Sequence, residues 1–593
     1  MSTWKELLFS DPFKVEGDII DESAQSKEAL VAKGDNFEQP AATKGELWGY
    51  YLYYNGDNGF TMNSYMPSKC YEKYRTPLEY ETNSPLLHHL DILQSLAYKG
   101  GFYLDTPDVQ GCDPSNTDKV CYVPWSGGPI PVASMSLYIQ AIAFSIQFVL
   151  FTTFGSLGDY GRWNRWILLG ATIIGCFTQI IPIVFVNNDG SQWNGMMGIM
   201  CIAWISYGAS LVFYAAAFPL LADNLPAVRQ ARFDPNVSRE EYVLVAEKWR
   251  NNVSAISTTF SNVGFLIVTA VLSGASFAPW ENYAFDADTP HVLGNVPLFN
   301  YISTVVCGGF WVINAIPYFL WVPARRGGPP LPPNEHYMTI GWKNIIGALR
   351  EARKLRYLFM YIIAYFLFSD AVNTLNSMIG ITQGQITSFN AQQVTILNLV
   401  SAICSIIGCM AFLWIQRYFK IRTKTNLLII IGLTAVVPIW GSIGIGTTRF
   451  GIHNTWELWV FYVWSGLFTA PIWAWQQTML AELVPKGREN LFFGLFGVVN
   501  KASSWIGPVV IGAITATTSN LWNGWPFVLA LFIISVVIIW FIDVDQAKED
   551  IRLYLEENIL PTDQGIELSH AKSIAEPVTE VNRAPSYEDE KRA

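Results

Sequence analysis

Two aspartates lie inside stretches of the sequence that are otherwise apolar. Asp370 lies in YFLFSDAVNTLNS (365–377), and Asp57 lies in GDNGFTMNS (56–64). An ionised Asp at the centre of a membrane span costs about 2.5–3.5 kcal/mol, so each carboxylate is expected to face protein or water. There it could hold the ammonium group of a substrate or carry a proton. The alternative is a structural role, in which paired hydrogen bonds pack one helix against another.

Polar residues follow each aspartate at helical spacing. They lie at i+3, i+6 and i+7 after Asp370, and at i+4 and i+7 after Asp57. Each helix is therefore predicted to present a polar stripe to one cavity. The residues concerned are Asn373, Asn376 and Ser377 in the first case, and Thr61 and Ser64 in the second, where Asn63 is the counterpart of Asn376.

One basic residue could complete such a site. Lys501 lies about ten residues into the apolar stretch 491–515, too deep to reach the surface easily, so it needs an acidic partner or loses its proton. Carboxylates and an ammonium around one cavity suit a zwitterion such as an amino acid, and Gln476 and Gln477 in WAWQQTM (473–479) add neutral hydrogen-bonding groups. Two alternatives remain: a permanent Lys–Asp bridge, and another small amphiphile as substrate.

The elements that position these residues are predicted to be membrane-spanning helices. Of the 593 residues 51% are hydrophobic and only 15% are charged, which disfavours a large soluble enzyme. Apolar stretches of about 20 residues recur along the chain, each long enough to cross a bilayer core of about 30 Å. We expect an all-α polytopic membrane protein with twelve spans: 47–66, 134–154, 166–187, 195–221, 254–278, 298–322, 357–380, 393–415, 426–446, 457–480, 491–515 and 525–543.

The loops between these spans predict the orientation. Loops 155–165, 223–253, 323–356, 416–425 and 481–490 together carry 20 Lys and Arg, whereas the short loops on the opposite side carry one, Arg449. The positive-inside rule therefore places both termini in the cytoplasm and the long loop 67–133 on the other side. The tails 1–45 and 546–593 are polar and acidic, and we expect both to be disordered and cytoplasmic.

The two halves of the chain resemble each other. The Pro/Gly-rich stretch PARRGGPPLPPNE opens the linker 323–356, which continues as an amphipathic helix on the membrane surface. This linker separates six spans in 46–322 from six in 357–545. GDNGFTMNS (56–64) aligns with SDAVNTLNS (369–377), and ADNLP (222–226) aligns with AELVP (481–485), at equivalent places in the two halves. We therefore expect two six-helix bundles around a central cavity.

Several motifs resemble known transporters. GSLGDYGRW (155–163) is similar to the signature of the major facilitator superfamily, with one residue fewer between Asp159 and the following Gly-Arg; Asp159 and Arg162 are predicted to act as a gate at the cytoplasmic mouth. LVPKGRENLFFGLFGVVNKASSWIGP (483–508), RRGGPPLP (325–332) and FLFSDAVNT (366–374) resemble the autophagy-related protein 22 family of that superfamily, over about 46–545. The resemblance implies the major facilitator fold and export of amino acids from the vacuole during autophagy.

The remaining features constrain cofactors and partners. CDPSNTDKVCYV (112–123) resembles the luminal cysteine pair of the same family, which implies a Cys112–Cys121 disulfide and a free Cys70. We find no metal-ligand spacing and no nucleotide-binding loop, so we expect no metal, no cofactor and no enzyme activity. Expected partners are amino acids, membrane lipid and, if transport is coupled, protons. We expect no nucleic acid and a monomer. A receptor or scaffold without transport is the alternative function.

Overall fold

The structure is a computed structural model, and almost all of its ordered elements are helices. It describes residues 12–13, 40–59, 88–112, 121–125, 128–160, 162–186, 190–234, 236–276, 298–322, 335–350, 354–386, 391–485, 488–503 and 520–558, with a few single positions between 506 and 518. Thr61 and Asn63 lie outside these residues. The backbone of Lys501 is helical, but its side chain is outside the described part.

Eight helical segments among the described residues are long and apolar enough to cross a membrane. They are 163–185, 193–223, 240–272, 301–321, 356–379, 396–419, 423–443 and 521–540. Each matches one of the predicted spans, so the chain is a multi-pass membrane protein. The other four predicted spans coincide with α3, α6, the pair α17 and α18, and α19; the total of twelve remains a prediction.

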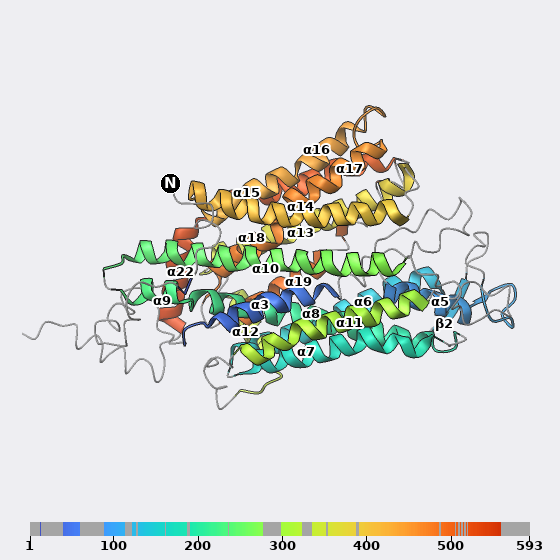
Figure 1. Cartoon of the computed structure of the whole chain (residues 1–593), viewed down its shortest axis with the longest axis horizontal. Helices are drawn as coiled ribbons and strands as arrows, with labels where there is room; N and C mark the ends of the chain where they lie inside the picture. The colour runs from blue at the N-terminus through green and yellow to red at the C-terminus, as the bar shows by residue number, and fades with distance from the viewer. Residues whose placement is uncertain are drawn as a thin grey trace, which may run out of the picture.

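The first part of the chain contributes helices that pack side by side along their length (Figure 1). α3 packs on α10 and α11, α7 packs on α8 and α11, and α6 packs on α8. The elements are α3 (Lys44–Gly56), α5 (His88–Gly100), α6 (Val132–Phe154), η3 (Ser156–Asp159), α7 (Trp163–Ile180), η4 (Ile181–Phe185), α8 (Trp193–Asp223), α9 (Pro226–Phe233), α10 (Arg239–Ser276) and α11 (Leu298–Trp321).

The second part adds a further group of helices. α13 packs on α19 and α21, and α15 packs on α18 and α21. The two groups meet where α10 contacts α14 and α18, and where α19 contacts α6, η3 and α8. The elements are α12 (Ile340–Arg350), α13 (Arg356–Ile386), α14 (Ala391–Phe419), α15 (Thr423–Thr434), α16 (Val436–Ile443), α17 (Thr455–Trp464), η6 (Ser465–Thr469), α18 (Ile472–Leu483), α19 (Glu489–Ser503), η7 (Leu521–Gly524), α21 (Trp525–Trp540) and α22 (Val544–Asn558).

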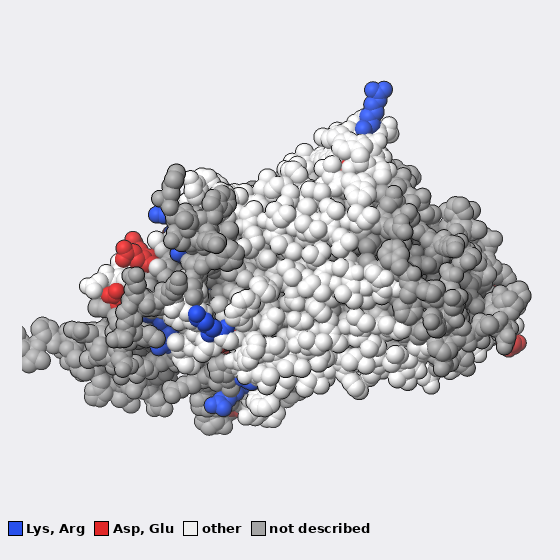
Figure 2. Space-filling view, viewed as in Figure 1, with Lys and Arg blue, Asp and Glu red and all other residues white. Residues whose placement is uncertain are grey.

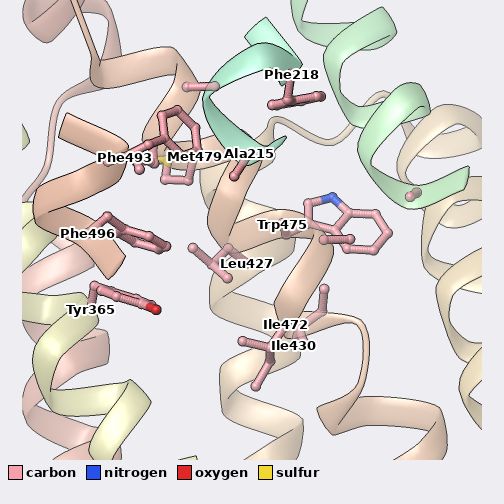
Figure 3. Packing of buried hydrophobic residues seen from close by; sticks show 14 of the residues in the cluster. Ala215, Phe218, Tyr365, Leu427, Ile430, Ile472, Trp475, Met479, Phe493 and Phe496 are labelled. Atoms are coloured by element: carbon pink, nitrogen blue, oxygen red, sulfur yellow. The ribbon is translucent and has the colours of Figure 1, made fainter. Parts of the chain in front are cut away.

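Buried aromatic side chains pack between the helices of the second group (Figure 3). Tyr365 of α13 stacks on Phe496 of α19 with ring centroids 3.5 Å apart. Trp475 of α18 is buried and donates from Nε1 to the side-chain oxygen of Gln416 at 2.8 Å. Because a buried indole N–H needs an acceptor, this bond fixes the orientation of the ring between α14 and α18.

A small sheet lies at the opposite end of the molecule from α22 (Figure 1). β1 (Phe102–Tyr103), β2 (Cys121–Trp125) and β3 (Gly128–Pro131) form an antiparallel sheet in that order, with Val123 paired to Ile130. A disulfide joins Cys112 to Cys121, as the family resemblance implies. α5 and the sheet share a buried cluster with α6 and α8, so this part of the long loop 67–133 is folded against the helices.

Two segments differ from the sequence-based expectations. Residues 223–253, expected to be a loop, form α9 and the first turns of α10. The tail that was predicted to be disordered from residue 546 begins as α22, and that part of the prediction was wrong. Ala547 and Tyr554 of α22 are buried, and the helix packs on α13 and α18. The amphipathic spacing of these two apolar residues was hidden by the acidic composition around them.

Charged and exposed aromatic side chains gather at the end of the molecule where α9 and α22 lie. On the face in Figure 2, Lys, Arg, Asp and Glu gather near the end where α9 and α22 lie, and a broad uncharged band covers the middle. Eight exposed aromatic residues lie at the helix ends next to this charged region, as expected where side chains meet a membrane–water interface. They are Trp48, Trp163, Trp166, Trp321, Tyr418, Phe419, Trp540 and Phe541.

Candidate functional site

Asp57 lies at the end of α3, and part of its carboxylate has no partner. It is the C-cap residue of the helix, and its backbone N–H donates to the carbonyl of Tyr53. The residue is 2% exposed, and Oδ2 is buried without a hydrogen-bond partner among the described residues. A buried oxygen of this kind costs free energy unless a proton, a cation or a bound group satisfies it. Asp57 is therefore a candidate binding or proton-carrying residue.

Tyrosine side chains surround this carboxylate. Tyr53, Tyr54 and Tyr214 all interact electrostatically with Asp57. The hydroxyl of Tyr53 is bonded to Thr172 Oγ1 at 2.6 Å, and that of Tyr214 donates to the carbonyl of Tyr50 at 3.0 Å. These bonds hold two of the three rings rigidly beside the carboxylate. The wall around Asp57 is thus preorganised rather than loosely packed.

Tyr54 links Asp57 to the second group of helices. Its hydroxyl interacts with the side chains of Gln477 on α18 and Ser261 on α10 as well as with Asp57. Gln477 is half-buried. The structure therefore brings two predicted site residues, Asp57 and Gln477, to the same tyrosine. Tyr54 could not be predicted as a site residue from the sequence, because a tyrosine in a membrane span is a common packing residue.

α3 and α10 are held close together beside Asp57 and Tyr54. Asn58 Nδ2 donates to Ser261 Oγ and to the Ser261 carbonyl, both at 2.8 Å, and Asn55 Nδ2 donates to the carbonyl of Phe260 at 2.7 Å. A Cβ at Gly264 would collide with the carbonyl oxygen of Asn55, so only glycine permits this approach. These bonds from amide side chains of α3 and the residues after it fix the position of α3 against α10.

One carboxylate oxygen of Asp370, the counterpart of Asp57, accepts hydrogen bonds from protein groups. Its Oδ1 accepts from the backbone N–H of Gly507 at 3.2 Å and from Thr374 Oγ1 at 3.4 Å. A Cβ at Gly507 would collide with Thr374, so the two segments are in close contact. Asp370 therefore holds α13 against the segment that follows α19. Among the described residues, no hydrogen bond or ion pair joins Asp370 to Asp57.

The other predicted site residues are dispersed. Asn373 is half-buried and Asn376 is exposed, whereas Asp370 and Thr374 are buried. Asn376 therefore does not share the face of Asp370, because six residues advance about 600° around an α-helix, which is 120° short of two full turns. Gln476 is buried, and its backbone carbonyl accepts from the Tyr361 hydroxyl at 2.8 Å.

Two carboxylates cap helices across the contact between the groups. Asp159 of η3 is buried, and its Oδ2 accepts from the backbone N–H of Leu491 at 3.0 Å, in the first turn of α19. Glu247 of α10 accepts with Oε1 from the N–H of Thr423 at 2.7 Å and from its hydroxyl at 3.0 Å, in the first turn of α15. A carboxylate at a helix N-terminus interacts favourably with the unpaired N–H groups there.

Arg162, the other predicted gate residue, does not take part in these contacts. It is exposed at the N-cap position of α7. Arg165, one turn further on, donates instead to the carbonyls of Val322 and Phe319 at the end of α11, the latter at 2.5 Å. A guanidinium satisfies the last carbonyls of a helix well, which explains this position.

The second repeated motif places two acidic residues in an ion-pair network. Asp223 at the end of α8 binds Arg250 of α10 through two bonds of 2.6 and 2.7 Å. Its counterpart Glu482 at the end of α18 lies 3.5 Å from Lys548 of α22. Glu482 also interacts electrostatically with Arg250, which connects the two pairs. The sequence repeat identified these carboxylates but did not reveal their partners.

Among the described residues, no group of His, Cys, Asp and Glu could hold a metal ion.

Comparison with known proteins gives one family match and several relatives. The family model described as "Vacuole effluxer Atg22 like" matches residues 91–552. Autophagy-related protein 22 of Yarrowia lipolytica is 26% identical over 483 residues, with 74% of this chain and 80% of the relative covered. Autophagy-related protein 22 of Pichia angusta is 22% identical over 565 residues, with 89% and 97% covered.

Solved structures resemble the chain more distantly. The E. coli fucose:proton symporter is 10% identical at a TM-score of 0.48, with 84% of this chain and 98% of the symporter covered. The human organic anion transporter MFSD10 is 13% identical at a TM-score of 0.48, with 87% and 100% covered.

Proposed function

Because the chain belongs to the Atg22-like vacuole effluxer family, we propose that it is a secondary transporter that moves amino acids from the vacuole lumen to the cytoplasm during autophagy. The observation that carries the proposal is the unpartnered, buried oxygen of Asp57, next to polar side chains of α3, α10 and α18. An ammonium group or a proton is the ligand that this oxygen favours.

We propose the architecture of a major facilitator, with six helices on each side of the linker 323–356. Support comes from the repeated motifs, since α3 and α13 carry the paired aspartates and α8 and α18 end in paired carboxylates. In a parallel-repeat transporter the substrate lies near the midplane between the repeats. Tyr54 and Gln477 interact across such a boundary, next to Asp57.

The proposed binding mode gives Asp57 and Asp370 different tasks. Asp57 accepts the α-ammonium group of the substrate or, when no substrate is bound, a proton. Asp370 positions α13 through Gly507, and Lys501 on the neighbouring helix takes the α-carboxylate. Asn373 and Gln476 extend the polar lining, and Thr61 and Asn63 complete it. Opposite charges at the two ends of the pocket would select a zwitterion over a simple amine or acid.

The proposed gate is the set of contacts at the charged end of the helices. The bond from Leu491 of α19 to Asp159 and the bond from Thr423 of α15 to Glu247 both join the two groups of helices, which supports a closed gate at this end. Release to the cytoplasm would require both carboxylates to leave their helix N-termini. Arg162 is exposed nearby and would act only after this opening.

The proposed setting follows from the basic loops and the family. Both termini face the cytoplasm, and the disulfide-bonded part of loop 67–133 faces the vacuole lumen, where a disulfide can persist. The partners are amino acids, protons if transport is coupled, and membrane lipid, with the chain acting as a monomer. We propose no cofactor, no enzyme activity and no nucleic-acid partner.

Uptake into proteoliposomes tests this function. The purified chain is reconstituted, and a panel of labelled amino acids is added with and without a pH gradient. We expect saturable uptake of at least one amino acid, blocked by an excess of the same unlabelled compound. Absence of both uptake and equilibrium binding for the whole panel would favour a receptor or scaffold and overturn the transport proposal.

A further inference from the structure

A guanidinium at the end of α14 is buried and has no counter-ion among the described residues. Nε, Nη1 and Nη2 of Arg417 are all inaccessible and have no hydrogen-bond partner among the described residues. The residue as a whole is only partly buried, so the guanidinium lies just beneath the surface. An Arg in a protein stays charged and carries five N–H donors. A hydrogen-bond acceptor with a negative charge would therefore stabilise this buried guanidinium.

Among the described residues, no negatively charged group interacts with Arg417. The groups that interact with it electrostatically are the Tyr51 hydroxyl of α3 and the Lys248 ammonium of α10. Lys248 is exposed, and its described contact is with the ring of Trp249, 5.7 Å away. No described carboxylate forms an ion pair with either residue. Two cations held together without an anion repel each other, and an anion between them would remove that cost.

The site lies beside exposed aromatic residues at the charged end of the helices. Tyr418 and Phe419, the next residues of α14, are 59% and 63% exposed. Trp48 of α3 is 52% exposed, and its ring lies 6.2 Å from that of Tyr51. Exposed Trp and Tyr at helix ends are typical of the depth where lipid headgroups meet acyl chains. The anion nearest to such a position is a lipid phosphate.

We propose that Arg417 and Lys248 form a binding site for the phosphate headgroup of an anionic lipid. Basic pockets between membrane helices are a recurrent form of headgroup site. The phosphate would accept hydrogen bonds from both side chains, and the acyl chains would lie against Trp48 and Phe419. Because Lys248 belongs to α10 and Arg417 to α14, a bound lipid would also bridge the two groups of helices where they pack together.

Lipid-dependent unfolding of the purified full-length chain tests the site. Wild type in detergent is titrated with dioctanoyl phosphatidic acid, with dioctanoyl phosphatidylcholine, and with inorganic phosphate. We expect phosphatidic acid to raise the unfolding temperature of wild type and the other two to leave it unchanged at matched concentrations. Arg417→Gln and Lys248→Gln should each weaken the apparent affinity for phosphatidic acid about tenfold or more. Arg449→Gln, in the loop before α17, should respond as wild type does.

The outcomes separate the site from a folding defect. In lipid-free detergent, Arg417→Gln should unfold at the same temperature as wild type or higher, because it removes an uncompensated buried charge. An equal response of wild type and Arg417→Gln to phosphatidic acid would overturn the proposal. So would a lower unfolding temperature of Arg417→Gln without lipid, because Arg417 would then have a structural partner. A shift with inorganic phosphate as large as that with phosphatidic acid would assign the site to a soluble anion and overturn the lipid source.

Discussion

Replacing Glu247 by Gln should open the charged end of the molecule. The substitution keeps the size of the side chain and an acceptor oxygen for the N–H and hydroxyl of Thr423, but it removes the charge. It also removes the ion pair with Arg422, whose Nε lies 3.2 Å from Oε2. We therefore expect a larger share of molecules in which α10 and α15 have separated.

The magnitude follows from two contributions. The ion pair is worth about 0–1 kcal/mol, because Arg422 is 41% exposed and water screens it. A carboxylate at a helix N-terminus contributes about 0.3–2 kcal/mol beyond a neutral acceptor. A total of about 1–2 kcal/mol changes the ratio of open to closed molecules about 5- to 30-fold. Glu247→Ala should have a larger effect, since it also removes both hydrogen bonds to Thr423.

Electron–electron distance measurements can detect this change. After replacement of the free cysteines, spin labels are placed at Asn236 and Gln546, which are exposed near the charged end on the two groups of helices. Glu247→Gln should enlarge the long-distance population, whereas Glu240→Gln, an exposed residue in the first turn of α10, should not. If Glu247→Gln and Glu247→Ala both kept the wild-type distance distribution, the assignment of this contact as a gate would be wrong.

Three further predictions concern stability. Asp223→Asn and Arg250→Met should each destabilise the protein by about 3–5 kcal/mol, because each leaves a buried charge unpaired. The double variant should be destabilised by clearly less. Additive losses of stability in thermal unfolding would contradict this prediction. Cys112→Ser should destabilise the long loop 67–133 by about 2–3 kcal/mol, because it removes the disulfide. The loop should then be cleaved faster by a protease, and a cleavage rate equal to that of wild type would contradict this prediction. Lys548→Met should lower the unfolding temperature, because it leaves Glu482 unpaired at a cost of about 1–3 kcal/mol. Adding Glu482→Gln should restore the unfolding temperature. If it did not, α22 would be held by other contacts.

The sequence predicted the helices well because membrane spans are specified by composition. A stretch of about 20 apolar residues has few alternatives to a helix in lipid, where every backbone group must be bonded internally. The repeat was equally informative, since it matched Asp223 with Glu482, and the structure shows both at helix ends in ion pairs. The family resemblance also led to the correct disulfide between Cys112 and Cys121.

The partners of the polar residues could not be predicted in the same way. The spacing of the residues places Asp57 and Asp370 on helices, but it does not reveal their partners. The backbone N–H of Gly507 donates to Asp370, whereas Oδ2 of Asp57 has no partner among the described residues. Such pairings join residues more than a hundred positions apart and depend on how the helices pack. The docked helix α22 was missed for a related reason: Ala547 and Tyr554 have a partner surface only in the folded chain.

Comparing Asp57→Asn with Asp370→Asn tests the central claim most directly. Both variants are reconstituted, and binding and counterflow are measured for the amino acid that wild type transports best. Loss of a charge-assisted hydrogen bond of about 1.5–3 kcal/mol should weaken binding to Asp57→Asn roughly ten- to a hundredfold. Asp370→Asn should lower the amount of folded protein but bind within a few-fold of wild type. Wild-type binding and counterflow in Asp57→Asn would contradict the account.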